Sequence, residues 1–187
     1  MKHRAVFLDR DGVLNRAFVV DGVPRPPASL VQLEILPGVA ESLALLRNAG
    51  FRLIVVTNQP DIARGRQTLE DVNRLNAALR ERLDFDDIYM CPHDDRDGCD
   101  CRKPQPGMLL RAAKAYGIDL RNSVMVGDRD RDIEAGRAAG CRTVFVDHGY
   151  GKAPQAPADL NVASLFEAVG WILGSHPANG RGHGAEN

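Results

Sequence analysis

Short apolar runs that alternate with helical segments are the feature that most limits how this sequence can fold. The run 52–58 (RLIVVTN) is continuous and rich in β-branched residues, as in a parallel strand that is covered on both faces. The preceding segment 38–50 has apolar residues at helical spacing and ends at Gly50. We expect strands at 4–8, 52–58, 86–91, 123–128 and 143–147, and helices at 38–50, 68–83, 107–117, 131–140 and about 163–173.

This alternation predicts an α/β fold with a Rossmann-like, doubly wound parallel sheet and helices on both faces. The length of 187 residues fits one domain, which we expect to span residues 1–173. We expect the Gly-rich tail 174–187 to be disordered, because it has too few apolar residues to form a core. The segment 16–34 contains three prolines and is expected to be irregular.

Charge and hydropathy exclude several classes of partner. The net charge of −1 gives no electrostatic reason to expect nucleic acid or an anionic membrane surface as a partner. The sequence has no apolar run near the roughly 18 residues of a membrane span, and its N-terminal apolar run is too short for a secretion signal. We therefore expect a cytoplasmic monomer that acts on a small molecule.

Polar residues stand where several of the predicted strands end. Asp9 and Asp11 follow the first strand, Thr57 and Asn58 end the second, and Asp128 ends the fourth. In open α/β sheets, ligands bind beyond the carboxyl ends of the strands. We therefore expect these side chains to meet in one site.

Asp9 and Asp11 can project to the same side of an extended segment, with Gly12 allowing the backbone to turn near a ligand. Two adjacent carboxylates repel each other unless a cation binds them or one keeps a proton. A cation favours Mg²⁺ with oxygen ligands, shared with a third carboxylate such as Asp128, whereas a retained proton makes one aspartate a general acid. Phosphoryl transfer uses both, because a carboxylate can attack phosphorus while a cation such as Lys103 stabilises the transition-state charge.

A second cluster lies in the segment 91–104 (CPHDDRDGCDCRKP), which contains three cysteines and a histidine at CxH and CxC spacing. Three thiolates and one imidazole match a tetrahedral Zn²⁺ site, and four protein ligands indicate a structural metal. A disulfide or free thiols are the alternatives. The predicted zinc ligands are Cys91, His93, Cys99 and Cys101. We expect Asp94, Asp95, Asp97 and Asp100 to be solvated rather than to be ligands, and Cys141 to be buried in the core.

Four segments resemble, in order, the motifs of the haloacid dehalogenase superfamily of aspartate-nucleophile phosphatases: FLDRDGVLN, VVTNQ, CRKPQPG and VMVGDRDRDI. The resemblance covers about residues 4–147 and leaves no room for a large cap domain. It implies that Asp9 is the nucleophile, that Asp11 is the acid and base, and that Thr57 and Lys103 bind the phosphoryl group. It also implies Mg²⁺ ligation by Asp9, the main-chain carbonyl of Asp11, and Asp128.

The metal loop before CRKP resembles the branch of this superfamily that contains the heptose 1,7-bisphosphate phosphatases and the histidinol-phosphate phosphatase domains. The segments TNQPDIARGRQT and KPQPGMLL favour the heptose branch, whereas the five residues between His93 and Cys99 are typical of the histidinol-phosphate branch. The heptose resemblance implies Mg²⁺-dependent removal of the C7 phosphate of D-glycero-D-manno-heptose 1,7-bisphosphate through an aspartyl-phosphate. That reaction belongs to nucleotide-activated heptose synthesis for surface glycans such as lipopolysaccharide.

The same resemblance implies that Asn58, Arg64 and Arg102 contact the phosphorylated sugar. Two alternatives remain open. One is histidinol-phosphate hydrolysis by the same chemistry, and the other is a catalytically silent zinc-binding module that binds a partner protein.

Overall fold

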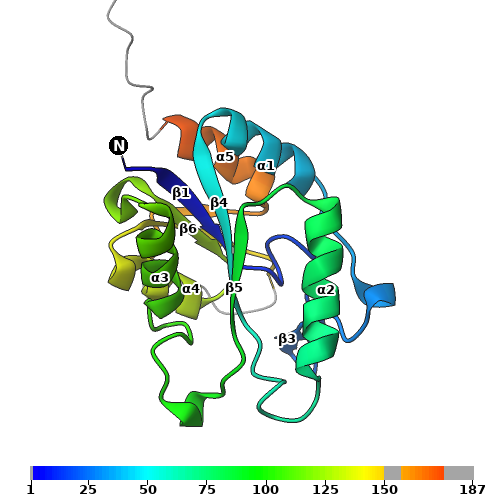
Figure 1. The fold of residues 1–187 in the computed structure, drawn as a ribbon. Coiled ribbons are helices and arrows are strands. Elements are labelled where there is room, and N and C mark those ends of the chain that lie inside the picture. The colour runs from blue at the N-terminus through cyan, green and yellow to red at the C-terminus, as the bar shows by residue number, and fades with distance from the viewer. Residues whose placement is uncertain (1, 150–156, 175–187) are drawn as a thin grey trace, which may run out of the picture.

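The computed structural model describes residues 2–149 and 157–174, and a six-stranded parallel sheet forms its centre (Figure 1). The spatial order of the strands is β5-β4-β1-β6-β7-β8, and every neighbouring pair is parallel. This is the order of a doubly wound nucleotide-binding sheet, so the predicted fold class is confirmed. The strands are β1 (Arg4–Leu8), β4 (Phe51–Asn58), β5 (Asp87–Cys91), β6 (Val124–Gly127), β7 (Arg142–Val146) and β8 (Leu160–Val162).

Helices cover both faces of the sheet, and each face has its own apolar core (Figure 1). Successive strand residues point to opposite faces. Val6 and Leu8 of β1 therefore belong to one core, and Ala5 and Phe7 belong to the other. The first core is covered by α1 (Val39–Asn48), α2 (Leu69–Arg82) and α5 (Leu165–Gly174), and the second by α3 (Gly107–Tyr116) and α4 (Asp130–Ala139).

The expected helices and strands are present, with bounds that shift by up to about two residues, but three short strands are additional. The expectation that 16–34 is irregular is wrong in part, because β2 (Phe18–Val20) and β3 (Val23–Arg25) pair as an antiparallel hairpin. Its two turn residues, Asp21 and Gly22, both have positive φ, as a tight hairpin turn requires. The third additional strand is β8.

Between β1 and α1 the described chain forms only this hairpin and a short 3₁₀ turn, Leu30–Gln32. No large cap domain therefore stands over the sheet in the part of the chain that is described. The last helix ends at Gly174, and residues 175–187 of the predicted tail lie outside the described residues. None of the described helices is long and apolar enough to cross a membrane.

Candidate active site and metal loop

The predicted acidic residues meet where the strand order reverses. Asp9 and Asp11 follow β1, and Asp128 follows the adjacent strand β6. Asp9, Asp11, Asn58 and Lys103 line one pocket of about 310 Å³. A ligand site at the carboxyl ends of the strands, beside the reversal point, is what this topology favours.

Lys103 bridges two carboxylates inside this pocket. Its Nζ atom donates a hydrogen bond to Oδ1 of Asp9 at 2.7 Å and lies 2.6 Å from Oδ1 of Asp132. The same ammonium donates to the main-chain oxygen of Val56 at 2.7 Å, and its side chain is 2% exposed. Burial alone lowers the pKa of Lys103, but Asp132 and Asp9 outweigh it and raise that pKa above its usual value. Lys103 is therefore a fixed positive charge at the base of the pocket.

For Asp9 the effect of burial on the pKa outweighs that of its charged partner Lys103, in contrast to Lys103 itself. The pKa of Asp9 is raised to about 6, because burial and the negative charges of Asp132 and Asp11 raise it by more than Lys103 lowers it. A second cation beside Asp9 would therefore favour its ionised form.

Three buried carboxylates lie together at this point. Asp9, Asp128 and Asp132 each offer an oxygen, and these oxygens lie within 4.8 Å of one another. Hard carboxylate oxygens are the donors that Mg²⁺ prefers, so the donor set fits that ion. The sequence-based prediction included Asp9 and Asp128 but missed Asp132. The third aspartate of DRDRD could have been noticed, because it falls in the first turn of α4, next to a strand end. The carboxylate of Asp11 is not part of this group.

The carboxylate of Asp11 is instead bound by three neighbouring side chains. It accepts hydrogen bonds from Arg10 Nη2 at 2.9 Å, from Asn15 Nδ2 at 2.9 Å and from Gln59 Nε2 at 2.8 Å. Gln59 also donates to Oγ1 of Thr57 at 2.9 Å and so connects two of the predicted catalytic residues. Sequence reasoning missed Arg10 and Gln59, because arginine and glutamine are mostly exposed and nothing in their spacing indicates burial.

The predicted metal ligands of the loop after β5 also converge. Sulfur atoms of Cys91, Cys99 and Cys101 lie 3.0–3.6 Å apart, and Nδ1 of His93 lies 3.3 Å from Cys101 Sγ. These separations are too long for a disulfide, whose bond is about 2.05 Å, and the cysteines are free thiols. Three thiols and one imidazole are donors that tetrahedral Zn²⁺ accepts, and the four atoms lie within 4.8 Å of one another, so the donor set fits a metal of this kind. Cys141 is buried in the second core, as expected.

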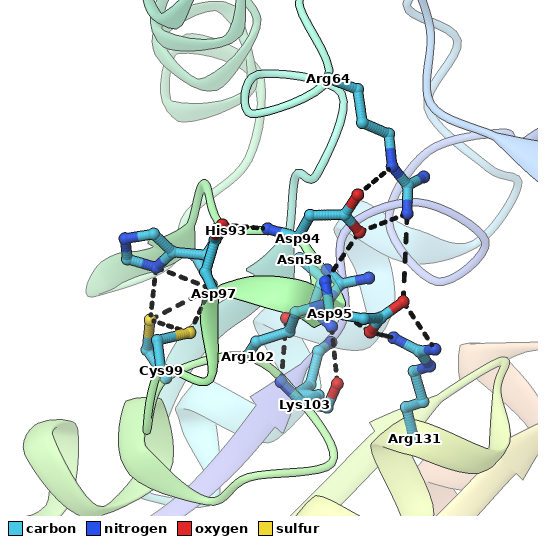
Figure 2. A network of polar contacts seen from close by, with 12 residues as sticks. Asn58, Arg64, His93, Asp94, Asp95, Asp97, Cys99, Arg102, Lys103 and Arg131 are labelled. Carbon is cyan, nitrogen blue, oxygen red and sulfur yellow. Dashed lines mark hydrogen bonds and ion pairs between the residues drawn. The ribbon is translucent and has the colours of Figure 1, made fainter.

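The rim of the pocket contains an arginine–aspartate network between the metal loop and its surroundings (Figure 2). Arg64 binds Asp94 through Nε at 2.9 Å and Nη2 at 2.5 Å, and this pairing lowers the pKa of Asp94 to about 2. Arg102 and Arg131 both bind Asp95. The four loop aspartates belong to neither group that could hold a metal, as expected, but Asp94 and Asp95 are paired with arginines.

Asn58 has a further structural contact. Its side-chain amide exchanges two hydrogen bonds of 3.0 Å with the main chain of Lys103. The predicted substrate residues Asn58, Arg64 and Arg102 thus all line the pocket, and each has a protein partner there.

Comparisons with known proteins agree with this geometry. A family model described as HAD-hydrolase-like matches residues 100–168. The chain is 40% identical over 156 residues to the D-glycero-beta-D-manno-heptose-1,7-bisphosphate 7-phosphatase of Pseudomonas aeruginosa, covering 81% of this chain and 85% of that protein. It is 39% identical over 184 residues to the protein of the same name from Escherichia coli K12, covering 91% of this chain and 88% of that protein.

Solved structures give the same result. The D,D-heptose 1,7-bisphosphate phosphatase from B. bronchiseptica, solved with magnesium and phosphate, superimposes with a TM-score of 0.79 at 31% identity. That match covers 92% of this chain and 99% of the other. The D,D-heptose 1,7-bisphosphate phosphatase from Burkholderia thailandensis gives a TM-score of 0.62 at 27% identity, covering 89% of this chain and 96% of the other.

Proposed function

Since this chain belongs to the family of the D-glycero-beta-D-manno-heptose-1,7-bisphosphate 7-phosphatases, within the haloacid dehalogenase-like hydrolases, we propose that it removes the C7 phosphate of heptose 1,7-bisphosphate. The observation that carries the proposal is the buried contact of Lys103 with Asp9 and Asp132 in the pocket. The chain is then a phosphoric monoester hydrolase of nucleotide-activated heptose synthesis, which supplies surface glycans such as lipopolysaccharide.

Two carboxylates divide the chemistry. An oxygen of Asp9 attacks phosphorus, the bond between phosphorus and the C7 oxygen breaks, and Asp11 gives its proton to the departing alkoxide. Asp11 then takes a proton from water, the water oxygen attacks the aspartyl-phosphate, and phosphate leaves Asp9. The contacts of Asp11 with Arg10 and Gln59 support this assignment, because they fix its orientation beside Asp9.

Fixed donors bind the phosphoryl oxygens during both steps. Lys103 offers a permanent positive charge, and the hydroxyl of Thr57 is oriented by Gln59. Asp9, Asp128 and the main-chain carbonyl of Asp11 would hold Mg²⁺, with Asp132 beside them. When bound, this ion reduces the repulsion between the Asp9 carboxylate and the phosphate dianion.

The metal loop has a structural role in this proposal. Cys91, His93, Cys99 and Cys101 would hold Zn²⁺ with all four positions filled by protein. Arg102 and Lys103 follow directly, so an ordered loop fixes where these two cations enter the pocket. The free thiols suit a reducing compartment, and we include a cytoplasmic location and a monomeric state in the proposal.

The two alternatives differ in what they leave unexplained. A silent interaction module has no need for a buried lysine between two buried aspartates, since such groups are costly to desolvate. Histidinol-phosphate hydrolysis is favoured by one observation, the short metal loop, and it needs the same catalytic residues. Substrate preference therefore decides between the two enzymes.

The test is a comparison of kcat/KM on three substrates with Mg²⁺ present: heptose 1,7-bisphosphate, histidinol phosphate and p-nitrophenyl phosphate. We expect the bisphosphate to be preferred, and ³¹P NMR to show that the C7 phosphate is lost while the anomeric phosphate remains. A large preference for histidinol phosphate reverses the assignment, and zinc binding without any Mg²⁺-dependent turnover favours the silent module. Light scattering during size-exclusion chromatography tests the monomer.

A further inference from the structure

Asp95, on the metal loop, is hydrogen-bonded to two arginines from different parts of the chain, and a third, Arg64, has its Nη2 atom 4.0 Å from Asp95 Oδ2 (Figure 2). Its Oδ1 accepts from Arg102 Nε at 2.9 Å and from Arg131 Nη1 at 2.6 Å, and its Oδ2 accepts from Arg131 Nη2 at 3.3 Å. Arg102 follows the last cysteine of the loop, whereas Arg131 belongs to α4 on the other side of the pocket rim. The carboxylate therefore joins the metal loop to α4.

The two guanidinium groups differ in burial. The side chain of Arg102 is 9% exposed and that of Arg131 is 42% exposed. Arg102 uses Nε for Asp95, while its buried Nη1 has no hydrogen-bond partner among the described residues. A buried donor without an acceptor is costly, so this edge of Arg102 is suited to an acceptor that arrives with a ligand.

Both arginines line the same pocket as Asp9. Two guanidinium groups with one carboxylate between them have a net charge of +1. Guanidinium is the side chain best suited to phosphate oxygens, because its planar donors match their spacing. Without the carboxylate, the two like charges would repel each other, and Arg131 would lose the one ion-pair partner that it has among the described residues.

On the basis of the proposed function, we propose that Asp95 is a positioning residue for substrate binding. It keeps Arg102 and Arg131 together at the rim, where the pair binds the phosphate that the reaction does not cleave. Arg131 thereby becomes a further ligand of that phosphate, and the metal loop and α4 contribute one arginine each.

A competing interpretation of Asp95 predicts the opposite change in KM. If Asp95 merely occupies the place of the substrate phosphate, removal of its charge makes the pocket more attractive to anions, and KM falls. If it positions the arginines, removal of its charge lets them separate, and KM rises. The direction of the change in KM therefore separates the two interpretations.

The experiment compares Asp95→Asn with Asp100→Asn as a matched control. Asp100 lies on the same loop and binds Arg111, outside this pocket, so the control removes the same charge without touching the rim. Kinetics are measured on heptose 1,7-bisphosphate and on p-nitrophenyl phosphate, which has a single phosphate. For Asp95→Asn we expect KM for the bisphosphate to rise about tenfold, as for loss of a charge-assisted contact, with kcat and the KM for p-nitrophenyl phosphate within about twofold of wild type.

Two further variants test the geometry. Asp95→Glu should restore most of the affinity, because it keeps the charge between the arginines. Arg131→Ala should raise KM as much as Asp95→Asn does, and the double variant should add little, since the two residues act as one unit. A fall in KM, an equal change on both substrates, a loss of zinc from Asp95→Asn, or no effect of Arg131→Ala each overturns the proposal.

The proposal and the proposed function fail in different ways. If the wild type hydrolyses p-nitrophenyl phosphate but not the heptose bisphosphate, the proposed function is wrong. The positioning role is then tested by inhibition of p-nitrophenyl phosphate hydrolysis with fructose 1,6-bisphosphate. We expect its inhibition constant to rise about tenfold in Asp95→Asn, and an unchanged constant overturns the role of Asp95.

Discussion

The acidic cluster of the pocket and the thiol cluster of the metal loop are assembled in opposite ways. Asp9, Asp128 and Asp132 come from two segments that are far apart in the sequence and meet because β1 and β6 are neighbours in the sheet. Lys103 reaches them from the end of the metal loop. The candidate metal ligands of the loop all fall within residues 91–101. The first cluster depends on the topology of the whole sheet, whereas the second depends on the spacing of one loop.

The two regions also differ in what supports them. The strands β1 and β6 beneath the acidic cluster are almost completely buried. The metal loop buries Cys91 and Cys101 in the second core and packs Cys99 against it, and residues 95–98 are exposed. Such a loop cannot bury enough apolar surface to order itself, so we expect it to need its metal. The three carboxylates of the acidic cluster should keep their arrangement through the sheet, whereas the position of Lys103 depends on the loop that it follows.

The largest effect tests the chemistry that we assign to the acidic cluster. Asp9→Asn removes the attacking carboxylate but keeps the shape of the side chain and one acceptor for Lys103. We expect kcat on p-nitrophenyl phosphate to fall by at least about 10⁴-fold, with an unchanged circular dichroism spectrum and zinc content. Substantial remaining activity in a highly purified sample would remove Asp9 from the role of nucleophile.

The next effect concerns Asp132, the acid that sequence reasoning missed. In Asp132→Asn, Lys103 keeps only Asp9 as a carboxylate partner and is drawn toward the nucleophile. We expect kcat/KM to fall by about 10²-fold, the upper range for residues that orient a reactive group. Zinc content should not change, because none of the four candidate ligands on the loop belongs to the acidic cluster; a parallel loss of zinc would contradict that separation. Asp130→Asn is the matched control, since it removes an acid from the same helix turn that does not line the active-site pocket.

The way in which each cluster is assembled also decides which of its residues could be predicted from the sequence. Asp9, Asp128 and the metal ligands could be predicted, because strand ends share one edge of a parallel sheet and ligand spacing within a loop is local. The roles of Asp132, Arg10 and Gln59 could not be predicted, because they depend on which side chain each residue contacts in the folded chain. The pairing of Asp95 with Arg131 joins positions 36 residues apart, and no periodicity indicates it.

Prediction of the fold from the sequence was limited in the same way. Strands with continuous apolar runs, such as β1 and β4, were predicted because burial on both faces dictates their composition. The three-residue strands β2, β3 and β8 were missed, since each is too short for a pattern and depends on a partner strand. Pro24 within β3 also argues against a strand except at an edge, which is where it lies.

A smaller effect tests whether the metal loop acts on catalysis only through position. Cys99→Ser should weaken metal binding and loosen Arg102 and Lys103, and we expect kcat/KM to fall about tenfold. Zinc content, measured by atomic absorption, should fall with it. Cys141→Ser is the matched control, because this thiol is buried but lies away from the loop; it should keep its zinc. Loss of zinc without any loss of activity would show that the loop does not position the two cations.

The smallest expected effect comes from Asp86, and it tests whether the sheet and the loop are stabilised separately. Asp86 directly precedes β5, and the candidate metal ligand Cys91 is the last residue of that strand. Burial alone raises the pKa of Asp86, but the Leu53 amide, at 2.7 Å, and Arg52 lower it below its ordinary value of 3.8. The stabilisation is therefore complete above about pH 4, and it is lost as pH falls through the lower folded-state pKa.

We expect Asp86→Asn to lower the free energy of unfolding by about 1–2 kcal/mol at pH 7, with the difference from wild type shrinking below pH 4 in urea titrations. Asp84→Asn, which removes an exposed acid from the same turn, should cost less than about 0.5 kcal/mol. Zinc content and kcat should stay at wild-type values in both variants, because a stabilising contact at one end of β5 is not required for a ligand set at the other. If Asp86→Asn loses zinc at pH 7, the order of the loop depends on the sheet. The two clusters then do not differ in what supports them.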